Sequence, residues 1–301
     1  MSRRVSYPRT NNGLINYLKE RGVLRDAAVE AVMRRVDRAH YADFNPYFDS
    51  PQDIGCNATI SAPHMHAIAL QLLAPALRDG ETRRALDVGA GSGYVTACMA
   101  LLQDEAADAV ADAGLVVGVE HIAQLAAFAT ANLRRDQPKL LRDGRVQVVV
   151  GDGRLGYAPE APFDAIHVGA AALEPPHELE AQLAAGGRMV VPVAEAGAGA
   201  SAGRQRLLLV QRSADGSRLR RTRKMAVNFV ALTDAARQWA GARPPPPARS
   251  ARPRPPARPP RPARAAPTSA LVPLGDARKP RPPPPPPDED DAPRGDHAPR
   301  Q

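Results

Sequence analysis

The chain has 301 residues, enough for one large domain or two small ones, and a formal net charge of +8. Residues 241–301 hold 12 Lys and Arg against 6 Asp and Glu, so residues 1–240 have a net charge of only +2, which argues against a nucleic-acid-binding domain. The two cysteines exclude a disulfide scaffold, and no apolar run is long enough to span a membrane, so we expect a cytoplasmic protein without a membrane anchor.

The first predicted elements are helices. Apolar residues recur at helical spacing in two early segments, at Leu14, Ile15 and Leu18 and then at Val29, Val32, Met33 and Val36 behind Asp26 as an N-cap. Residues 40–63 are predicted to form a long loop, and a loop of that length inside a compact domain is usually functional. A further helix is predicted over 67–77. Residues 10–80 are thus expected to form a helical cap.

Strand-like and helical segments alternate from residue 84 onward. The predicted strands are 84–88, 115–119, 145–150, 164–168, 188–193 and 206–211, and the predicted helices are 94–103, 122–135 and 176–184. This alternation predicts right-handed β-α-β units and a mainly parallel sheet. Segments 206–211 and 225–232 have no helix between them, which predicts an antiparallel edge hairpin with its turn at Asp215-Gly216. The expected fold is α/β, with its core over residues 81–240.

Residues 241–301 differ in character from the rest. They contain 21 of the 32 prolines and almost no large apolar side chains. Such a segment cannot bury enough surface to offset its ordering entropy, so a disordered Pro/Arg-rich tail is predicted. We favour a solvated extension with no specific partner. An SH3- or WW-type domain, or an acidic surface, is the alternative partner for its proline and arginine runs.

The most informative motif follows the strand at 84–88. Asp87 precedes Gly89, Gly91 and Gly93, and a helical pattern begins at Tyr94. A strand, a glycine turn and a helix form a nucleotide-cofactor signature, because glycine lets a ligand contact bare backbone. The spacing is G-x-G-x-G, and no G-K-[ST] follows to hold a triphosphate. The motif therefore predicts a nucleoside ligand without a diphosphate, for which S-adenosyl-L-methionine fits best.

An acidic residue on the next strand supports this prediction. Glu120 ends the apolar segment Leu115-Val-Val-Gly-Val, where its carboxylate can accept hydrogen bonds from two ribose hydroxyls. Glycine-rich turns are common, but the turn together with Asp87 and Glu120 predicts a methyltransferase.

A second motif lies in the loop before the sheet, at Ala58-Thr-Ile-Ser-Ala-Pro-His-Met-His66. Read from the residues alone, Ser61 is a helix N-cap and Pro63 a first-turn proline. His64 and His66 are close together, but no Cys or carboxylate set completes a metal site, so no metal is expected. His167 lies in a buried strand pattern and is expected to be a core histidine.

These segments together resemble the protein-L-isoaspartate (D-aspartate) O-methyltransferase family. The resemblance is collinear over about residues 10–240. It is carried by Arg38-Ala-His-Tyr41, Asn45-Pro-Tyr47, Asp49-Ser-Pro-Gln52, the blocks at 58–66, 85–96, 149–154 and 163–171, Tyr157, Leu232-Thr-Asp234 and Gln238-Trp239. The block at 58–66 is particular to this family, whereas many methyltransferases share the glycine turn.

The resemblance implies a Rossmann-like class I methyltransferase fold and a definite activity. Members transfer the methyl of S-adenosyl-L-methionine to the α-carboxylate of L-isoaspartyl residues, and less efficiently to the side-chain carboxylate of D-aspartyl residues, in damaged proteins and peptides. Ser61 matches the active-site serine. The matching cofactor contacts are Ala58, Thr59, Ile60, His66, Ser92, Glu120, Asp152, Gly153, Thr233 and Gln238, to which the glycine motif adds Asp87, Gly89, Gly91 and Gly93.

The chain departs from the family pattern at several places. Glu120 stands where the family often has Asp, and residues 104–114 lengthen a surface connection. The Gly/Ala/Ser segment 195–204 differs from the family pattern, and residues 241–301 have no counterpart in it. The added methylene of Glu120 keeps the charge, so we expect it to be tolerated.

The implied chemistry needs few catalytic groups. A carboxylate is already ionised at neutral pH, so no general base is required, and the enzyme has only to align and desolvate it. Two alternatives remain open: a class I methyltransferase acting on a small molecule or RNA, and an interaction protein acting through its tail. A monomer is expected.

Overall fold

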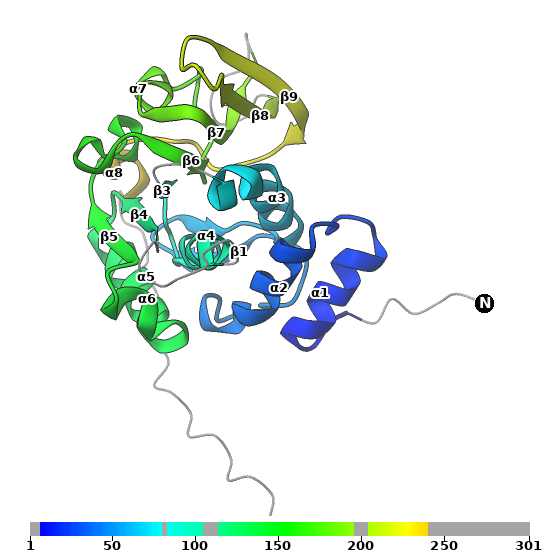
Figure 1. Ribbon diagram of the computed structural model, residues 1–301. Coiled ribbons are helices and arrows are strands. Elements are labelled where there is room, and N and C mark those ends of the chain that lie inside the picture. The colour runs from blue at the N-terminus through cyan, green and yellow to red at the C-terminus, as the bar shows by residue number, and fades with distance from the viewer. Residues whose placement is uncertain (1–6, 80–82, 105–113, 196–203, 240–301) are drawn as a thin grey trace, which may run out of the picture. The chain divides into compact units, whose positions relative to one another are not determined.

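A seven-stranded sheet forms the centre of the protein, for which a computed structural model describes residues 7–79, 83–104, 114–195 and 204–239 (Figure 1). Five strands pair in parallel with one another, and two more are added at one edge by antiparallel pairing, which confirms the predicted α/β sheet with an antiparallel edge hairpin. In spatial order the strands are β5 (Val146–Val150), β4 (Leu115–Glu120), β3 (Arg84–Val88), β6 (Phe163–Val168), β7 (Leu183–Ala194), β8 (Gln205–Arg212) and β9 (Leu219–Val227). The predicted disorder of 241–301 lies outside the described residues.

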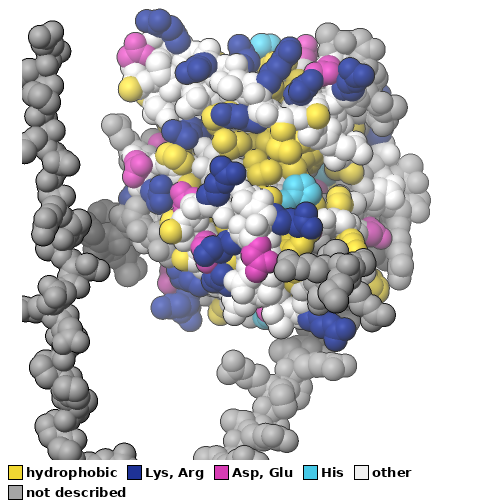
Figure 2. All heavy atoms as spheres, turned by 90° about the vertical axis from the view of Figure 1, so that its right-hand side faces the viewer, with side chains coloured by type: hydrophobic (Ala, Val, Ile, Leu, Met, Phe, Trp, Pro, Cys, Tyr) yellow, Lys and Arg dark blue, Asp and Glu magenta, His cyan; other side chains and the backbone are white. Residues whose placement is uncertain are grey.

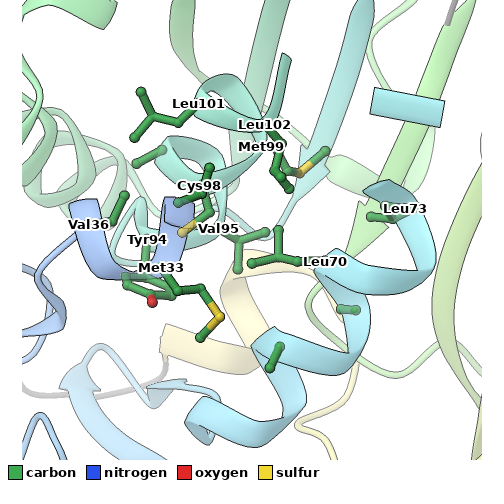
Figure 3. Close-up of a cluster of buried hydrophobic side chains, with 14 of the residues drawn as sticks. Met33, Val36, Leu70, Leu73, Tyr94, Val95, Cys98, Met99, Leu101 and Leu102 are labelled. Atoms are coloured by element: carbon green, nitrogen blue, oxygen red, sulfur yellow. The ribbon is translucent and has the colours of Figure 1, made fainter. Parts of the chain in front are cut away.

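Most helices cover one face of the sheet. A large core on that face joins α1 (Asn11–Glu20), α2 (Ala27–Arg35), α3 (Pro63–Asp79), α4 (Tyr94–Asp104), α5 (Ala123–Asp136) and α6 (Pro138–Arg142). Figure 3 shows part of this core, which includes Met33, Leu70, Tyr94 and Cys98. Asp26 caps α2 as predicted, accepting the Ala28 and Val29 N–H groups at 2.9 and 3.0 Å.

The opposite face carries shorter elements. Leu86 and Val88 of β3 point into a second core with Leu179 of α7 (His177–Ala181). The short helices η3 (Gly153–Leu155) and η4 (Ala158–Glu160) precede β6, and α8 (Ala235–Trp239) closes the described part of the chain. Because side chains alternate along a strand, Ala85 and Asp87 face the α3–α4 side while Leu86 and Val88 face α7.

The segment predicted as a long loop, 40–63, contains local structure. The short helix η1 (Arg38–His40) leads into it, and β1 (Gln52–Gly55) pairs antiparallel with β2 (Ala58–Ile60). Cys56 and Asn57 form the hairpin turn with φ of 54° and 53°. Turns with two positive φ values match the twist of a hairpin. The strands are too short for their pattern to be recognised in sequence.

The strand boundaries near the edge of the sheet differ from those predicted. The second strand of the edge hairpin is Leu219–Val227, not 225–232. Hydrogen bonds between Ser213 and Arg218 close the turn at Asp215-Gly216, so the strand begins directly after Arg218. Basic residues at 220–224 concealed the strand. The helix predicted over 176–184 is only α7, and β7 begins at Leu183 instead of 188. No helix in the described ranges is long and apolar enough to cross a bilayer.

Candidate active site

The glycine turn lies where β3 ends at the carboxyl edge of the parallel sheet. Gly89, Gly91 and Gly93 have φ of +79°, +54° and +85°, a conformation that favours glycine. No atom lies within 4 Å of where a Cβ on Gly89 would sit, so its backbone faces open space. Gly93 serves a different purpose, because its Cβ position lies 3.2–3.4 Å from atoms of Ala129 on α5. Gly89 therefore presents bare backbone to a ligand, Gly91 gives its N–H to the Glu120 carboxylate, and Gly93 allows close packing of α5.

Glu120 ends β4 beside this turn, because β3 and β4 are neighbouring parallel strands. Its buried carboxylate accepts the Gly91 N–H at 3.0 Å and the Ile122 N–H at 3.1 Å. Burial raises the pKa of Glu120, and the Ile122 and Gly91 N–H groups oppose that rise. Each oxygen has one backbone donor and can accept a second hydrogen bond, which suits a ligand with hydroxyl donors.

The C-terminal segment covers the same place. Gln238 donates from Nε2 to the Cys56 carbonyl at 3.1 Å, and its Oε1 lies 2.9 Å from His121 Nε2. Asn57 Nδ2 donates to the Gln238 carbonyl at 2.9 Å. These bonds join α8, the β1–β2 turn and the end of β4 around one hollow. Its lining consists of Ala58, Thr59, Val88, Gly89, Gly91, Val119, Glu120, His121, Asp152, Gly153, Gly169, Ala170, Val230, Ala231, Leu232, Thr233 and Gln238.

Asp152 and Gly153 reach this hollow from the end of β5. Asp152 caps η3 by accepting the Arg154 N–H at 3.0 Å, and it also pairs with the Arg154 guanidinium at 2.6 Å. The hydrogen bond from the Arg154 side chain is the main reason that the pKa of Asp152 is lowered. A Cβ on Gly153 would lie 2.6 Å from Val88 Cγ1, so only glycine fits there without movement.

A second hollow adjoins the first through Thr59, Gly89, Gly91 and Gly169. Ile60, Ser61, His66, Asp87, Ser92 and His167 also line it. Asp87 is buried and accepts from Thr96 Oγ1 at 2.6 Å, and its other oxygen lies 2.8 Å from His167 Nδ1. His167 is thus the hydrogen-bonded core histidine expected from its strand, and it also faces the hollow.

Arg38 holds two residues of this second hollow, Ser61 and His66, through hydrogen bonds. It is fully buried, donates to the Ser61 carbonyl at 2.6 Å and lies 3.0 Å from His66 Nδ1. A guanidinium can only donate, so this hydrogen bond assigns the His66 proton to Nε2. Burial, followed by the Arg38 charge, holds the pKa of His66 well below 6.5. The His66 ring stacks on Tyr94 with centroids 5.0 Å apart, so His66 is a neutral hydrogen-bond donor in a fixed orientation.

Ser61 lies between the second hollow and an outer groove of about 810 Å³. The N-cap interpretation of Ser61 is wrong, because α3 begins at Pro63, directly after Ala62. The His64 N–H in the first turn of α3 donates to the Asp49 carboxylate at 2.9 Å, so Ser61 does not cap it. The prediction of Pro63 in the first turn is confirmed. Within the described residues, no group hydrogen-bonds to the Ser61 hydroxyl. That hydroxyl is therefore available to a ligand in the groove.

The fold gathers all but one of the residues predicted from sequence, with only Gly93 lying outside the two hollows. Sequence reasoning missed Arg38 and His121 as parts of the site. His121 directly follows Glu120 at a strand end, which could have drawn attention to it. Arg38 lies in a block that carries the family resemblance, but its role gave no local signal, because its partners lie more than 20 residues away. No group of three or more His, Cys, Asp or Glu side chains in the described ranges is arranged to hold a metal ion.

A parallel sheet with an exposed glycine turn after β3 and a buried acid after β4 defines a Rossmann-like methyltransferase. A model of the protein-L-isoaspartate(D-aspartate) O-methyltransferase family matches residues 9–237. The chain belongs to this family.

Individual relatives agree with that assignment. The protein-L-isoaspartate O-methyltransferase of Triticum aestivum is 47% identical over 231 residues, covering 76% of this chain and 93% of the relative. Protein-L-isoaspartate O-methyltransferase 1 of Arabidopsis thaliana is 41% identical, covering 77% and 94%. Among solved structures, a protein-L-isoaspartate O-methyltransferase of Plasmodium falciparum in complex with S-adenosyl-L-homocysteine is 35% identical with a TM-score of 0.66, covering 75% and 99%.

Proposed function

We propose that this protein transfers the methyl group of S-adenosyl-L-methionine to the free α-carboxylate of L-isoaspartyl residues, and less efficiently to the side-chain carboxylate of D-aspartyl residues, in damaged proteins and peptides. The observation that carries the proposal is Ser61. Its unpartnered hydroxyl lies between the hollow beside the glycine turn and the outer groove, in a chain that belongs to the isoaspartyl methyltransferase family.

The chain's own residues fit the cofactor. Glu120 offers acceptor capacity for a pair of hydroxyls, and Gly89 offers backbone that no side chain covers. Asp152, Thr233 and Gln238 complete the rim of the first hollow, on the nucleoside side. Asp87, Ser92 and His66 line the second hollow, on the amino-acid side, together with Thr59 and Ile60 of β2, whereas Ala58 of the same strand lines the first hollow. When bound, the cofactor supplies an activated methyl group.

The remaining task is to hold a carboxylate that is already nucleophilic. A carboxylate has a pKa near 4, so it is ionised at neutral pH without a base. Ser61 donates a hydrogen bond that orients the substrate carboxylate toward the second hollow. Arg38 fixes the Ser61 backbone through its carbonyl. The apolar groove wall, which includes Met65 and Phe229, excludes water from the ionised oxygen.

A matched pair of peptides tests this function. The protein is incubated with methyl-labelled cofactor and two peptides that differ only in an aspartyl or an isoaspartyl linkage. We expect label in the isoaspartyl peptide alone. Equal labelling of both peptides would reject the substrate while leaving a methyltransferase, and labelling of neither would favour the alternative that the protein acts on a small molecule or RNA.

The organisation of the chain belongs to the same proposal. We place the whole enzyme within residues 1–240 and give 241–301 no part in the chemistry, either as a solvated extension or as a site for an SH3- or WW-type or acidic partner. We also propose that the protein is a monomer. The two cysteines are free and buried, as expected in the reducing cytoplasm. Size-exclusion chromatography with light scattering tests the monomer.

A further inference from the structure

Strand β9 lies at one edge of the sheet. It ends the strand order, and among the described residues it pairs only with β8. An edge strand presents unpaired N–H and C=O groups that another extended chain can bind. The edge is nine residues long, from Leu219 to Val227, which is long enough to bind an extended peptide segment.

The outer part of this edge is strongly basic. Residues 218–224 read Arg-Leu-Arg-Arg-Thr-Arg-Lys and contain no acid. Arg221 forms an ion pair with Glu180 at 2.6 Å, and the positive charge of Arg223 attracts the Glu195 carboxylate at longer range. No ion pair within the described ranges involves Arg220 or Lys224, and both side chains are exposed. Figure 2 shows Lys and Arg side chains gathered above a patch of hydrophobic side chains on this side of the molecule.

The basic edge is continuous with the groove at Ser61. One wall of the groove is Met225–Val230, so it begins where the basic part of β9 ends. At about 3.3 Å per residue, Arg220 lies ~16 Å along the strand from Met225. A peptide whose damaged residue reaches Ser61 and whose chain continues along β9 would pass Lys224 first and Arg220 about four residues later.

We propose that the β9 edge binds the flank of the substrate polypeptide as an added strand and selects damaged sites with Asp or Glu residues within about six positions on one side. This inference rests on the proposed function and adds a sequence preference to it. The added strand supplies main-chain hydrogen bonds, and opposite charges on adjacent strands attract across the pair.

Basic residues on an edge strand also serve a simpler purpose. They keep sheet edges from pairing with other proteins, and that role requires only charge. The two roles differ in what they predict for substrates. Protection against edge pairing gives no preference for one side of the damaged residue, whereas docking along β9 favours acidic residues on one side only.

Three isoaspartyl peptides separate these roles. One has neutral flanks, one has three Glu residues on the N-terminal side, and one has them on the C-terminal side. The full chain is compared with R220Q/R223Q/K224Q and with a control, R134Q/K139Q/R142Q, which removes the same charge from exposed positions on α5 and α6. Each is assayed at low ionic strength and at about 0.5 M salt, where exposed charges are screened.

One acidic peptide should exceed the neutral peptide in kcat/KM by about fivefold at low salt, through a lower KM and an unchanged kcat. The gain should vanish in the β9 variant and at high salt and persist in the control. Equal turnover of the neutral peptide by all three proteins shows that the chemistry is intact. An equal gain from both acidic peptides, no gain from either, or a gain that survives in the β9 variant would overturn the proposal.

A binding measurement does not depend on turnover. A fluorescein-labelled acidic peptide without a damaged residue should bind the wild type and the control more tightly than the β9 variant in fluorescence anisotropy. This measurement still decides the docking proposal if the neutral isoaspartyl peptide is not methylated and the proposed function fails. If a single-stranded oligonucleotide of equal charge displaces the labelled peptide better than the unlabelled acidic peptide does, the surface is assigned to nucleic acid instead.

Discussion

The Ser61 hydroxyl offers the sharpest test of the proposed chemistry. It makes no hydrogen bond within the described structure, and it does not cap α3. Ser61→Ala therefore removes no internal interaction, and we expect the free energy of unfolding to change by less than about 0.5 kcal/mol. If the hydroxyl orients the substrate carboxylate, kcat should fall by about 10- to 100-fold, which corresponds to ~1.4–2.8 kcal/mol of activation free energy.

The assay measures turnover of an isoaspartyl peptide, cofactor affinity by calorimetry, and stability by urea unfolding. Cofactor affinity should stay within about twofold, because the hydroxyl acts on the substrate. Ser50→Ala is a matched control in the same loop. The Ser50 hydroxyl accepts from Gln52 Nε2 at 2.7 Å, so its loss should cost about 1 kcal/mol of stability and leave kcat unchanged. A Ser61→Ala enzyme with wild-type kcat would refute the orienting role.

Four further predictions follow from the site and its surroundings. Glu120→Ala should raise the cofactor dissociation constant at least tenfold in calorimetry and cost about 2 kcal/mol of stability, because two backbone N–H groups lose their acceptor. Burial raises the pKa of Glu120 above its ordinary value of 4.5, so the wild-type carboxylate becomes protonated before the pH has fallen to 4.5. The affinity for S-adenosyl-L-homocysteine should therefore begin to fall above pH 4.5. An affinity that is constant down to pH 4.5 would contradict this prediction. The same protonation relieves the cost of burying a charge, so the contribution of Glu120 to folding stability improves as the pH falls. Arg38→Met leaves the Ser61 carbonyl and His66 Nδ1 without their donor, and urea unfolding should report a loss of about 3 kcal/mol, whereas an unchanged midpoint would reject the role of Arg38. Deleting 241–301 should leave kcat and KM for the peptide unchanged, because every site residue named here precedes position 239, and a loss of activity would assign the tail a part in the site.

Local patterns in the sequence were enough for the architecture and the glycine turn. Parallel strands alternating with helices leave a signal in each segment, and Gly89, Gly91 and Glu120 follow strand ends that come together at one edge of the sheet. The strand at Leu219–Val227 was not predicted at its correct position, because a run of basic residues on an edge strand has the composition of a loop. Residues 58–66 were assigned to the site through the family resemblance, while the residues alone favoured a cap at Ser61 that the structure rules out.

The sequence by itself determined the alternation of strands and helices after residue 84 and where the cofactor-type turn lies, because these depend on hydrophobic periodicity and glycine spacing over a few residues. Only the tertiary structure decided which distant residues meet. Arg38 reaches His66 across 28 positions, and Gln238 reaches Cys56 across 182. Such contacts depend on how helices and loops pack over the sheet edge, and packing selects partners by shape and hydrogen bonding without leaving a periodic trace in the chain. The availability of the Ser61 hydroxyl is decided at that level too, because it depends on Asp49, 12 positions earlier, binding the helix end in its place.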